Sequence, residues 1–439
     1  MAGDETTKFG AYPNTAWETC QATGEQCLLD FSNTSDPLAF TPLSTCAQGS
    51  VPNYYIGVQN PEDVSVALNF SRTTGIPLVV KNTGISYNSS FTPEGCSQAG
   101  ISAVTFGAGV TFRSLYAFAD AQNITIIGGT DDSIAAGGGY LMGGGHSAFS
   151  NSLGLTVDHA LEFEVVTPDG QHRIANSCVN SDLFFALRGG GGGTLGVVLQ
   201  ITIRAFPGFS FSVLQTVFMG VPSIEIQREF VKFLIDNALP WASKGWGGYI
   251  EAGYLLFLHY KTRLTFPAWT RSDLNGTFVL QEETSWLSFF NQFVAPTGLP
   301  DGLPSAVGSR LIPATVFDSE SQKAALLDIV MSAVPKHATA LLFPVAPYFF
   351  KGDDQTILNP AWRSSLWHNE AYLFESNFSN TSAISMTWLQ ANITVEMFWG
   401  PNYPELLRIK EKYDPYHLMD CWRCVGWNGP SAARFGSYP

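Results

Sequence analysis

The chain has 439 residues, of which 45% are hydrophobic and 14% charged, a composition that predicts folded domains with sizeable cores and excludes a disordered chain. Its net charge of −14, without a cluster of Lys and Arg, argues against a nucleic-acid partner. The longest apolar run, residues 338–350, contains two prolines and is too short to cross a bilayer, so we expect no membrane association.

The first regular elements are expected before residue 85. Residues 55–59 and 76–80 are typical of strands, and residues 61–75 are typical of a helix that starts at a proline and ends at a glycine. Strand, helix and strand in this order indicate an α/β unit. The second strand runs into Asn82-Thr83-Gly84, a turn of small residues that often offers backbone N–H groups to an anion.

Further elements follow as far as Pro207. They are a strand, a helix and a strand, then a hairpin, a short helix and a last strand, expected at residues 103–109, 111–122, 124–129, 160–175, 181–189 and 197–207. After Pro207 the glycine clusters end, and helices such as 223–239 occur with aromatic-rich strands such as 247–260. We therefore expect a second domain at 207–393 and a tail at 394–439 that begins with a charged helix.

Two glycine clusters, residues 128–149 and 187–198, are the best candidates for a binding site. Gly191, Gly193 and Gly196 match the G-x-G-x-x-G pattern formally, but a helix precedes it and a strand follows it, which inverts the order of a dinucleotide-binding fold. The clusters are interleaved with large apolar residues, whereas a flexible linker would be polar. This pattern favours backbone that packs closely against a flat ligand.

Two other kinds of site are disfavoured. Ser147 lacks the glycine two residues later that a hydrolase nucleophile elbow needs, because Phe149 occupies that position. Cys421 and Cys424 form a C-x-x-C pair without a second pair of metal ligands, so a disulfide or simple burial is expected rather than zinc. We expect no metal site.

Glycosylation sequons and cysteines indicate the secretory pathway. Eight Asn-x-Ser/Thr sequons occur, at Asn33, Asn69, Asn88, Asn123, Asn275, Asn377, Asn380 and Asn392. We expect a disulfide between Cys27 and Cys46, and one of the seven cysteines must stay unpaired within a monomer. The polar start, Met1 to Glu5, is unlike a signal peptide, so the chain is interpreted as a mature or trimmed form.

Five blocks of sequence occur in a characteristic order, at residues 55–84, 137–170 (beginning GGGYLMGGGHSAF), 180–198, 309–313 and 398–415. Together they resemble the berberine-bridge-enzyme-like FAD-linked oxidases, which share the flavin domain of vanillyl-alcohol oxidase. The resemblance covers nearly the whole chain. It implies an α+β protein with a PCMH-type FAD-binding domain at 1–206, completed by 394–439, and a substrate domain at 207–393 with an antiparallel sheet covered by helices.

The resemblance also implies which residues contact FAD. They are Asn82, Thr83 and Gly84 in the pyrophosphate turn; Gly129, Thr130, Asp131, Gly138, Gly139, Gly143, Gly144 and Ser147 in the first glycine cluster; Gly196 and Val197 at a strand start; and Asn402 and Tyr403 in the tail. A buried aromatic at a domain interface is an equally good interpretation of Tyr403.

Two departures from the family pattern concern the attachment of FAD. The family places a histidine that can bond to the flavin directly after the Asn-Thr-Gly turn, but here Ile85 follows Gly84, and the stretch that normally comes next is missing. Members with a second covalent bond have a cysteine where this chain has Asp131. We therefore expect noncovalent FAD. The gap is natural, or it reflects an incomplete chain, or the fold serves a non-redox role as a pseudoenzyme or cyclase.

By the same resemblance, the chain is expected to be a monomeric oxidase that transfers a hydride from an alcohol, sugar or secondary metabolite to FAD, with reoxidation by O2 to H2O2. Glu375 is the candidate base and Tyr372 its neighbour. A solvated carboxylate at a strand end is the alternative interpretation of Glu375. Aromatic residues at alternate positions either line the substrate face or pack in the core, namely Tyr249, Tyr254, Phe257 and Tyr260.

Overall fold

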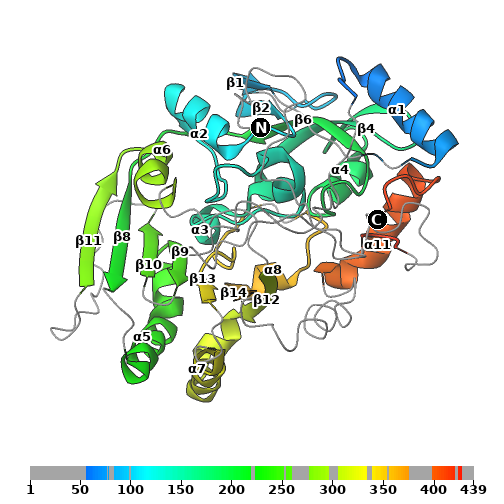
Figure 1. Ribbon diagram of the computed structural model, residues 1–439. Helices are drawn as coiled ribbons and strands as arrows, with labels where there is room; N and C mark the ends of the chain where they lie inside the picture. Colours follow the sequence, from blue (N-terminus) through cyan, green and yellow to red (C-terminus); the bar gives the residue numbers. More distant parts are fainter. Residues whose placement is uncertain are drawn as a thin grey trace, which may run out of the picture.

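The computed structural model describes residues 56–76, 78, 84–97, 100–218, 223–251, 254–259, 276–295, 305–333, 339–352, 355–374, 398–420 and 424–427. Two large antiparallel sheets dominate this part of the chain, one built from residues 85–204 and the other from residues 211–374 (Figure 1). The antiparallel sheets with packed helices confirm the predicted α+β class.

The first sheet has five strands in the order β1-β2-β6-β4-β5. Their bounds are β1 Ile85–Phe91, β2 Ile101–Gly107, β4 Ala160–Val166, β5 His172–Asn176 and β6 Val197–Arg204. The predicted hairpin is confirmed as β4 and β5. Its turn is closed by hydrogen bonds from the Gly170 N–H to the Thr167 carbonyl (2.8 Å) and from the Thr167 N–H to the Gln171 carbonyl (3.0 Å).

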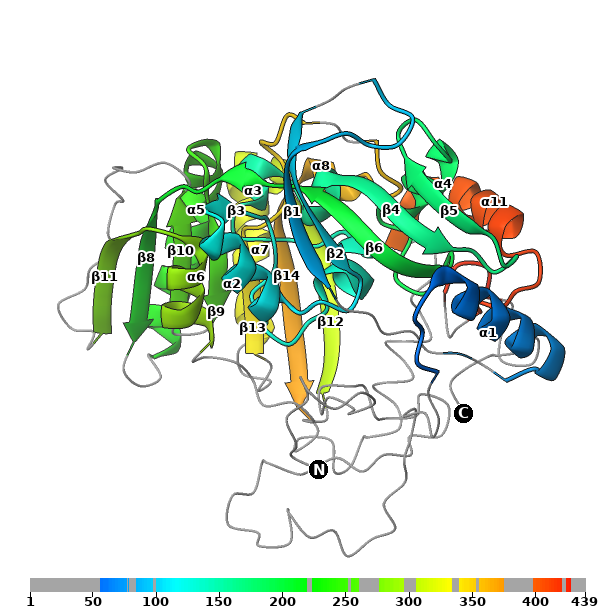
Figure 2. The same ribbon diagram turned by 90° about the horizontal axis from the view of Figure 1, so that it is seen from above.

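Helices gather at one end of this sheet (Figure 2). They are α1 Pro61–Thr74, α4 Ser181–Leu187 and α11 Tyr403–Tyr413. The start of α1 forms a capping box, since the Asn60 side chain accepts from the Asp63 N–H (3.1 Å) and the Asp63 side chain accepts from the Asn60 N–H (3.2 Å). Gly75 ends the helix in the left-handed conformation (φ 77°).

The strands that we expected on either side of α1 are absent from the residues described there. Residues 56–58 carry no strand pairing, and neither do Ile76 and Leu78. Apolar runs this short do not distinguish a strand from an extended loop.

The predicted strand at 124–129 is also mostly wrong. Only β3, Ile124–Thr125, pairs, and its partner is β7, Phe206–Pro207. Ile126 and Ile127 are buried without strand pairing. The following backbone packs under the rings of the helix α2, Phe112–Ala121, because a Cβ at Gly128 would lie 2.4 Å from the Tyr116 hydroxyl. Packing against α2 therefore replaces a sheet partner.

The second sheet has seven strands in the order β11-β8-β10-β9-β13-β14-β12. Their bounds are β8 Phe211–Phe218, β9 Trp246–Glu251, β10 Tyr254–His259, β11 Gly276–Glu283, β12 Ser305–Pro313, β13 Thr339–Phe343 and β14 Ser365–Phe374. Helices α5, Ile224–Ser243, and α7, Glu320–Ala333, cover the face that lies away from the first sheet (Figure 1).

Strand alternation decides which side chains face each layer. In β8, Leu214 packs in the core beneath α5 and α7, whereas Phe211 and Val213 join the core shared with the first sheet. The short helix α6, Trp286–Phe289, closes that shared core. The remaining short helical turns are η1 Ala136–Tyr140, α3 Ser150–Leu153, η2 Thr156–His159, η3 Phe290–Val294, η5 Ala314–Asp318, α8 Ala361–Ser364 and η8 Gly400–Asn402.

A disulfide joins Cys96, between β1 and β2, to Cys178, between β5 and α4. This pairing was not predicted from the sequence, and the expected pair, Cys27 and Cys46, lies outside the described residues. Cys424 is disulfide-bonded as well, in agreement with the preference for a disulfide over zinc in the C-x-x-C pair. Among the described helices, none is both long enough and apolar enough to cross a membrane.

Candidate flavin site

The two glycine clusters meet in the fold. The Gly191 N–H donates a hydrogen bond to the Met142 carbonyl (2.9 Å). A Cβ at Gly192 would lie 2.9 Å from the Cα of Gly139, so only glycine allows the two backbones to touch there. On the other side, a Cβ at Gly139 would meet nothing within 4 Å. The clusters therefore form one surface of bare backbone that is packed on one side and open on the other.

Tyr140 supports this surface from within. A Cβ at Gly145 would lie 2.6 Å from the Tyr140 ring, and Gly145 has a left-handed backbone (φ 70°). The Tyr140 hydroxyl donates to the His146 carbonyl, and its ring packs edge-on against Phe112 at 4.8 Å. The apolar residues between the glycines thus hold the turn in place, as the sequence suggested.

The predicted tail residues contact the glycine surface indirectly, through Leu358 and Trp399. The Asn402 side chain donates to the carbonyl of Leu358 (2.7 Å), and Leu358 packs against Gly144 and Gly189. The Trp399 indole donates to the Gly189 carbonyl (2.9 Å), and the Tyr403 ring stacks on Trp399 at 6.0 Å. The two tail residues predicted to close over the cofactor therefore support the backbone that borders it.

A buried lysine ties the tail helix to the second glycine cluster. The Lys410 ammonium donates to the carbonyls of Thr194 (2.7 Å) and Met419 (2.8 Å) and to the Asp414 carboxylate (2.5 Å). Burial lowers the pKa of Lys410, and the Asp414 charge opposes that shift. Asp414 in turn accepts from the N–H groups of Leu418 and Met419. The sequence signal was a Lys and an Asp four residues apart, which usually marks an exposed helix pair.

The other predicted cofactor residues of the first cluster lie along the same backbone. Gly129 is buried and its carbonyl accepts from the Tyr116 hydroxyl (2.6 Å), while Thr130 is partly buried. Asp131 is exposed and accepts from the N–H and hydroxyl of Ser133. The Ser147 hydroxyl accepts from the Phe149 N–H (3.4 Å). Gly138 and Gly143 are partly buried and exposed, respectively.

The remaining predicted residues lie directly before β1 and at the start of β6. Gly84 precedes β1, and its carbonyl accepts from the Gly107 N–H (2.7 Å); its predicted companions, Asn82 and Thr83, lie outside the described residues. Gly196 packs against the Val166 carbonyl, and Val197 belongs to a small core with α1.

The two predicted catalytic residues are placed only in part. The backbone of Tyr372 lies in β14, paired with Val307 of β12 and Thr339 of β13. Glu375 lies outside the described residues. Of the aromatic residues considered for the substrate face, Tyr249 lies between the two sheets, where it packs against Phe343 at 5.3 Å.

Sequence reasoning missed a cluster of rings where the first glycine cluster meets the second sheet. We call it the interface cluster; it consists of His146, Tyr249, Phe343, Trp362 and His368. The ring centroids of the two histidines are 5.7 Å apart. Burial lowers the pKa of His146 to about 3 and that of His368 to about 4, so both imidazoles are neutral at pH 7.

A buried ion pair holds the second sheet against the first half of the molecule. Arg363, in α8, donates two hydrogen bonds to the Asp158 carboxylate in η2 (2.6 and 2.8 Å). Asp158 also accepts from the Leu155 N–H (2.8 Å). This bidentate pair fixes α8, and with it the neighbouring Trp362, beside the glycine surface.

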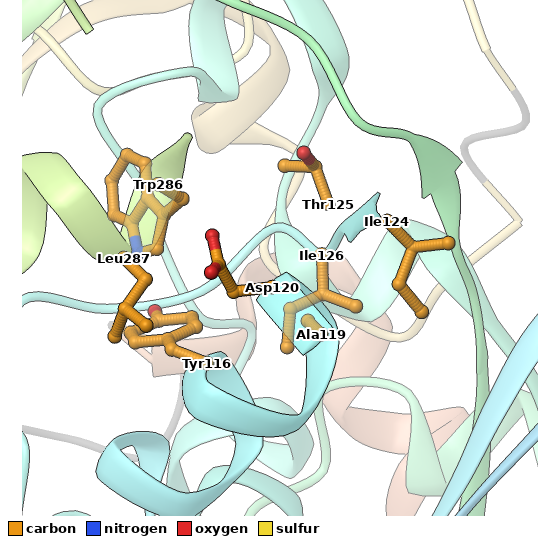
Figure 3. Close-up of a pocket in the computed structure, with 8 residues that line it drawn as sticks. All are labelled: Tyr116, Ala119, Asp120, Ile124, Thr125, Ile126, Trp286 and Leu287. Atoms are coloured by element: carbon orange, nitrogen blue, oxygen red, sulfur yellow. The ribbon is translucent and has the colours of Figure 1, made fainter. Parts of the chain in front are cut away.

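A shallow hollow lies elsewhere, between α2 and α6 (Figure 3). Its volume of about 10 Å³ is enough for about one water molecule, far less than a small-molecule site needs. Its lining residues are Tyr116, Ala119, Asp120, Ile124, Thr125, Ile126, Trp286 and Leu287. We assign no cofactor to it.

The described part of the glycine surface fits FAD. Bare backbone without Cβ atoms allows a flat or phosphate-bearing ligand to approach closely, and the open side at Gly139 and Gly193 leaves space for one. The buried Nδ1 of His146 has no hydrogen-bond partner at the adjoining interface, which is the kind of atom that a ligand can satisfy.

Comparison with known proteins identifies the family. The family described as FAD binding domain matches residues 52–176, and the family described as berberine and berberine like matches residues 371–419. FAD-linked oxidoreductase ffsJ of Aspergillus flavipes is 32% identical over 521 aligned positions, covering 98% of this chain and 85% of the relative. The chain belongs to the berberine-bridge-enzyme-like FAD-linked oxidoreductases. The expected family, enzyme class and cofactor are thereby confirmed.

Other members and solved structures agree with this assignment. FAD-linked oxidoreductase cheF of Chaetomium globosum is 31% identical, covering 92% of this oxidoreductase and 74% of the relative. The VAO-type flavoprotein MtVAO615 of Myceliophthora thermophila C1 has the same fold, with a TM-score of 0.73 at 24% identity, covering 88% and 81% of the two chains. Glucooligosaccharide oxidase of Acremonium strictum has a TM-score of 0.62 at 18% identity, covering 82% and 89%.

The alignment with ffsJ also bears on the length of this FAD-linked oxidoreductase. Its 521 aligned positions exceed the 439 residues of the chain, so the relative contains residues that have no counterpart here. That these residues include the stretch predicted to be missing after Gly84 stays a prediction.

Proposed function

We propose that this FAD-linked oxidoreductase is a secreted oxidase that binds FAD noncovalently and oxidises an uncharged small molecule bearing a hydroxyl group. The observation that carries the proposal is the meeting of the two glycine clusters in a surface of bare backbone beside the seven-stranded sheet. Substrate that enters between this surface and the sheet lies next to any flavin held there.

Different residues of the chain would bind the cofactor, support its site and act on the substrate. Backbone of both glycine clusters would hold FAD, while Trp399 and Lys410 keep that backbone in place. Glu375 is the proposed base for the substrate hydroxyl proton, and Tyr372 of β14 is its proposed neighbour. When bound, FAD would supply the redox chemistry, taking a hydride from the substrate carbon and passing two electrons to O2, which gives H2O2.

The absence of suitable side chains supports noncovalent binding. The residue after Gly84 is Ile85, whose side chain has no nucleophilic atom, and Asp131 accepts hydrogen bonds from Ser133. For comparison, the structure of glucooligosaccharide oxidase carries 6-S-cysteinyl, 8α-N1-histidyl FAD. We propose that the glycine surface alone retains FAD in the present chain.

Secretion is supported by the surface chemistry. The sequon residues Asn69, Asn88 and Asn123 are all exposed, so each could carry a glycan. The disulfide between Cys96 and Cys178 is typical of an oxidising compartment. Treatment of the protein, purified from a eukaryotic secretion host, with an endoglycosidase should lower its mass; an unchanged mass would contradict this part of the proposal.

The first test of the proposal is the visible spectrum of the purified full-length chain before and after acid precipitation. Flavin that moves to the supernatant would support noncovalent binding. Flavin that stays in the pellet would show a covalent bond at a residue that we have not identified. Colourless protein that stays colourless after incubation with FAD would contradict the oxidase.

Oxygen reactivity can be tested without knowing the substrate. Protein-bound flavin reduced with dithionite is mixed with air-saturated buffer, and reoxidation is followed at the flavin absorption band together with peroxide. An oxidase should reoxidise faster than free reduced FAD and release H2O2. A reoxidation rate no faster than that of free FAD would mean that the protein is an oxidoreductase whose electron acceptor is not O2. Light scattering on the same sample would test the expected monomer.

One observation favours a second function, a non-redox protein on the same fold. The chain lacks positions that ffsJ contains, and it departs from the family pattern at the pyrophosphate turn itself. A pseudoenzyme or a cyclase would use the glycine surface and the interface cluster for binding only. It would be folded and thermally stable yet remain colourless in the presence of FAD.

A further inference from the structure

We propose that His146 binds a hydroxyl group of the substrate through the Nδ1 atom of its imidazole. The inference rests on the proposed function, and it names a substrate-binding residue for the same site. His146 directly follows Gly145 within the first glycine cluster, and its ring extends to the seven-stranded sheet, where it lies 5.7 Å from His368 and 5.8 Å from Phe343, centroid to centroid.

The backbone that carries His146 is fixed from both sides. The Gly144 and Gly145 carbonyls accept from the N–H groups of Val157 (3.0 Å) and Thr156 (2.8 Å). On the other side, the Ser147 N–H donates to the Ser150 hydroxyl (2.7 Å), and the Tyr140 hydroxyl holds the His146 carbonyl itself. A residue held in this way presents its ring at a defined position, as a binding group must.

The imidazole has a polar atom that the protein leaves unsatisfied. Nδ1 of His146 is buried and has no hydrogen-bond partner, and an unpaired buried polar atom is destabilising. The interface cluster is not sealed off from the surface, because His146, Tyr249 and Trp362 are each partly exposed as residues. A small molecule can therefore approach the interface cluster and supply the missing hydrogen bond.

The surroundings of His146 select for an uncharged ligand. Burial and the neighbouring His368 are the influences that lower the pKa of His146, and no carboxylate, lysine or arginine among the described residues contributes. A charged ligand group would thus find no counter-charge from them here. A neutral imidazole, by contrast, has one nitrogen that accepts a hydrogen bond, and the walls of Tyr249, Phe343 and Trp362 suit an apolar or aromatic body.

The test uses the full-length chain labelled with ¹⁵N-histidine and a matched pair of probes, benzyl alcohol and toluene, which differ by the hydroxyl group. The chain has seven histidines, and the His146 signals are assigned by their loss in the His146→Asn variant. We expect benzyl alcohol to shift the Nδ1 resonance of His146 and toluene to leave it unchanged.

Affinities of the variants sharpen the test. His146→Leu, which removes the acceptor, should weaken benzyl alcohol binding about tenfold and leave toluene binding unchanged. His146→Asn places an amide oxygen close to the Nδ1 position and should retain binding within about threefold, so it also guards against loss of folding in the leucine variant. The control is His159→Asn, another buried histidine, which packs against Phe206 away from the interface cluster and should change neither affinity.

Each outcome bears on the proposal separately from the oxidase. Equal loss of both probes in His146→Leu would mean that the ring only packs, and it would overturn the proposal. So would an Nδ1 signal that is already hydrogen-bonded without a probe and that stays unchanged, since a bound water would then satisfy His146. If the protein binds benzyl alcohol through His146 but takes up no FAD, the binding role of His146 is supported and the oxidase is contradicted. The two results are distinguishable because the flavin content is measured separately from the visible spectrum.

Discussion

The helices α11 and α1 both lie beside the five-stranded sheet, but their surroundings differ strongly. Around α11, polar groups are buried and paired, since the Lys410 ammonium has three acceptors and the Asp414 carboxylate receives two backbone N–H groups besides it. Around α1, apolar side chains face the solvent instead. Five of the exposed large hydrophobic residues lie within residues 56–76, namely Ile56, Val58, Val66, Phe70 and Ile76.

This difference points to where the chain departs from its family. The well-satisfied end contains the family's tail motif, which is present in full. The exposed end lies next to Gly84, where the family pattern predicts a missing stretch. Val66 and Phe70 are four residues apart and lie on one side of α1, and exposed apolar side chains of this kind are expected where a covering segment is missing. The retained half of the site should therefore be stable, and α1 should be the weak point.

The largest effect is expected from breaking the buried ion pair. Lys410→Met would leave the Asp414 carboxylate buried without its cation and detach Thr194, so the free energy of unfolding should fall by about 3–5 kcal/mol. Urea unfolding followed by circular dichroism measures it. Lys412→Met is the matched control on the same helix, because its pair with Asp182 is exposed and should contribute less than about 1 kcal/mol. An equal loss of unfolding free energy in both variants would contradict the expected difference between the buried and the exposed ion pair.

Removal of the disulfide should have the next largest effect. The double variant Cys96→Ser, Cys178→Ser opens a covalent loop with a sequence separation of 82 residues and should lower the free energy of unfolding by about 2–4 kcal/mol. The bond ties the β1–β2 connection to the well-packed end of the sheet. We therefore expect amide hydrogen exchange to increase first in β1 and β2. Faster amide exchange confined to α11 would contradict this expectation.

Acid should destabilise the interface cluster. The pKa of His146 lies at about 3 and that of His368 at about 4 in the folded state, below the ordinary value of about 6.5. The unfolded chain therefore binds protons that the folded chain excludes, so this stability is complete above pH 6.5 and is lost as the pH falls towards 4. At pH 5 the loss is up to about 2 kcal/mol for each imidazole. His146→Asn should make the pH dependence of urea unfolding less steep between pH 7 and 5.

The smallest effect on stability is expected at the exposed surface of α1. Val66 is 69% and Phe70 is 45% exposed, so Val66→Ser and Phe70→Ser should each change the free energy of unfolding by less than about 0.5 kcal/mol. Leu68→Ala, on the buried side of the same helix, should cost about 2–5 kcal/mol. The serine variants should reduce binding of a hydrophobic dye. Unchanged dye binding would show that the apolar surface is covered in solution.

Local chemistry made part of the fold predictable. The helix α1 and the β4–β5 hairpin follow from short-range signals, a starting proline with a closing glycine in one case and a Pro-Asp-Gly turn in the other. The glycine clusters also indicated backbone that packs closely, and the contact between Gly192 and Gly139 has that character. The short strand at Ile124 was overestimated because buried apolar residues packed on a helix resemble a strand in sequence.

Long-range contacts explain what the sequence did not reveal. Lys410 and Thr194 are 216 residues apart, and a Lys–Asp pair at helical spacing gives no hint that the ammonium is buried. His146 comes from the loop that ends the GGGYLMGGGHSAF block and His368 from strand β14, and no local signal links the two. Such juxtapositions depend on how the two sheets pack, which no local pattern encodes.

The anchoring of Thr194 by Lys410 has a consequence for the order in which the protein is made. Residues 128–196 emerge from the ribosome long before helix α11, which fixes them, so the glycine surface is complete only after α11 has been made. FAD uptake should then wait for α11, and chains that end before Lys410 should be unable to retain the cofactor.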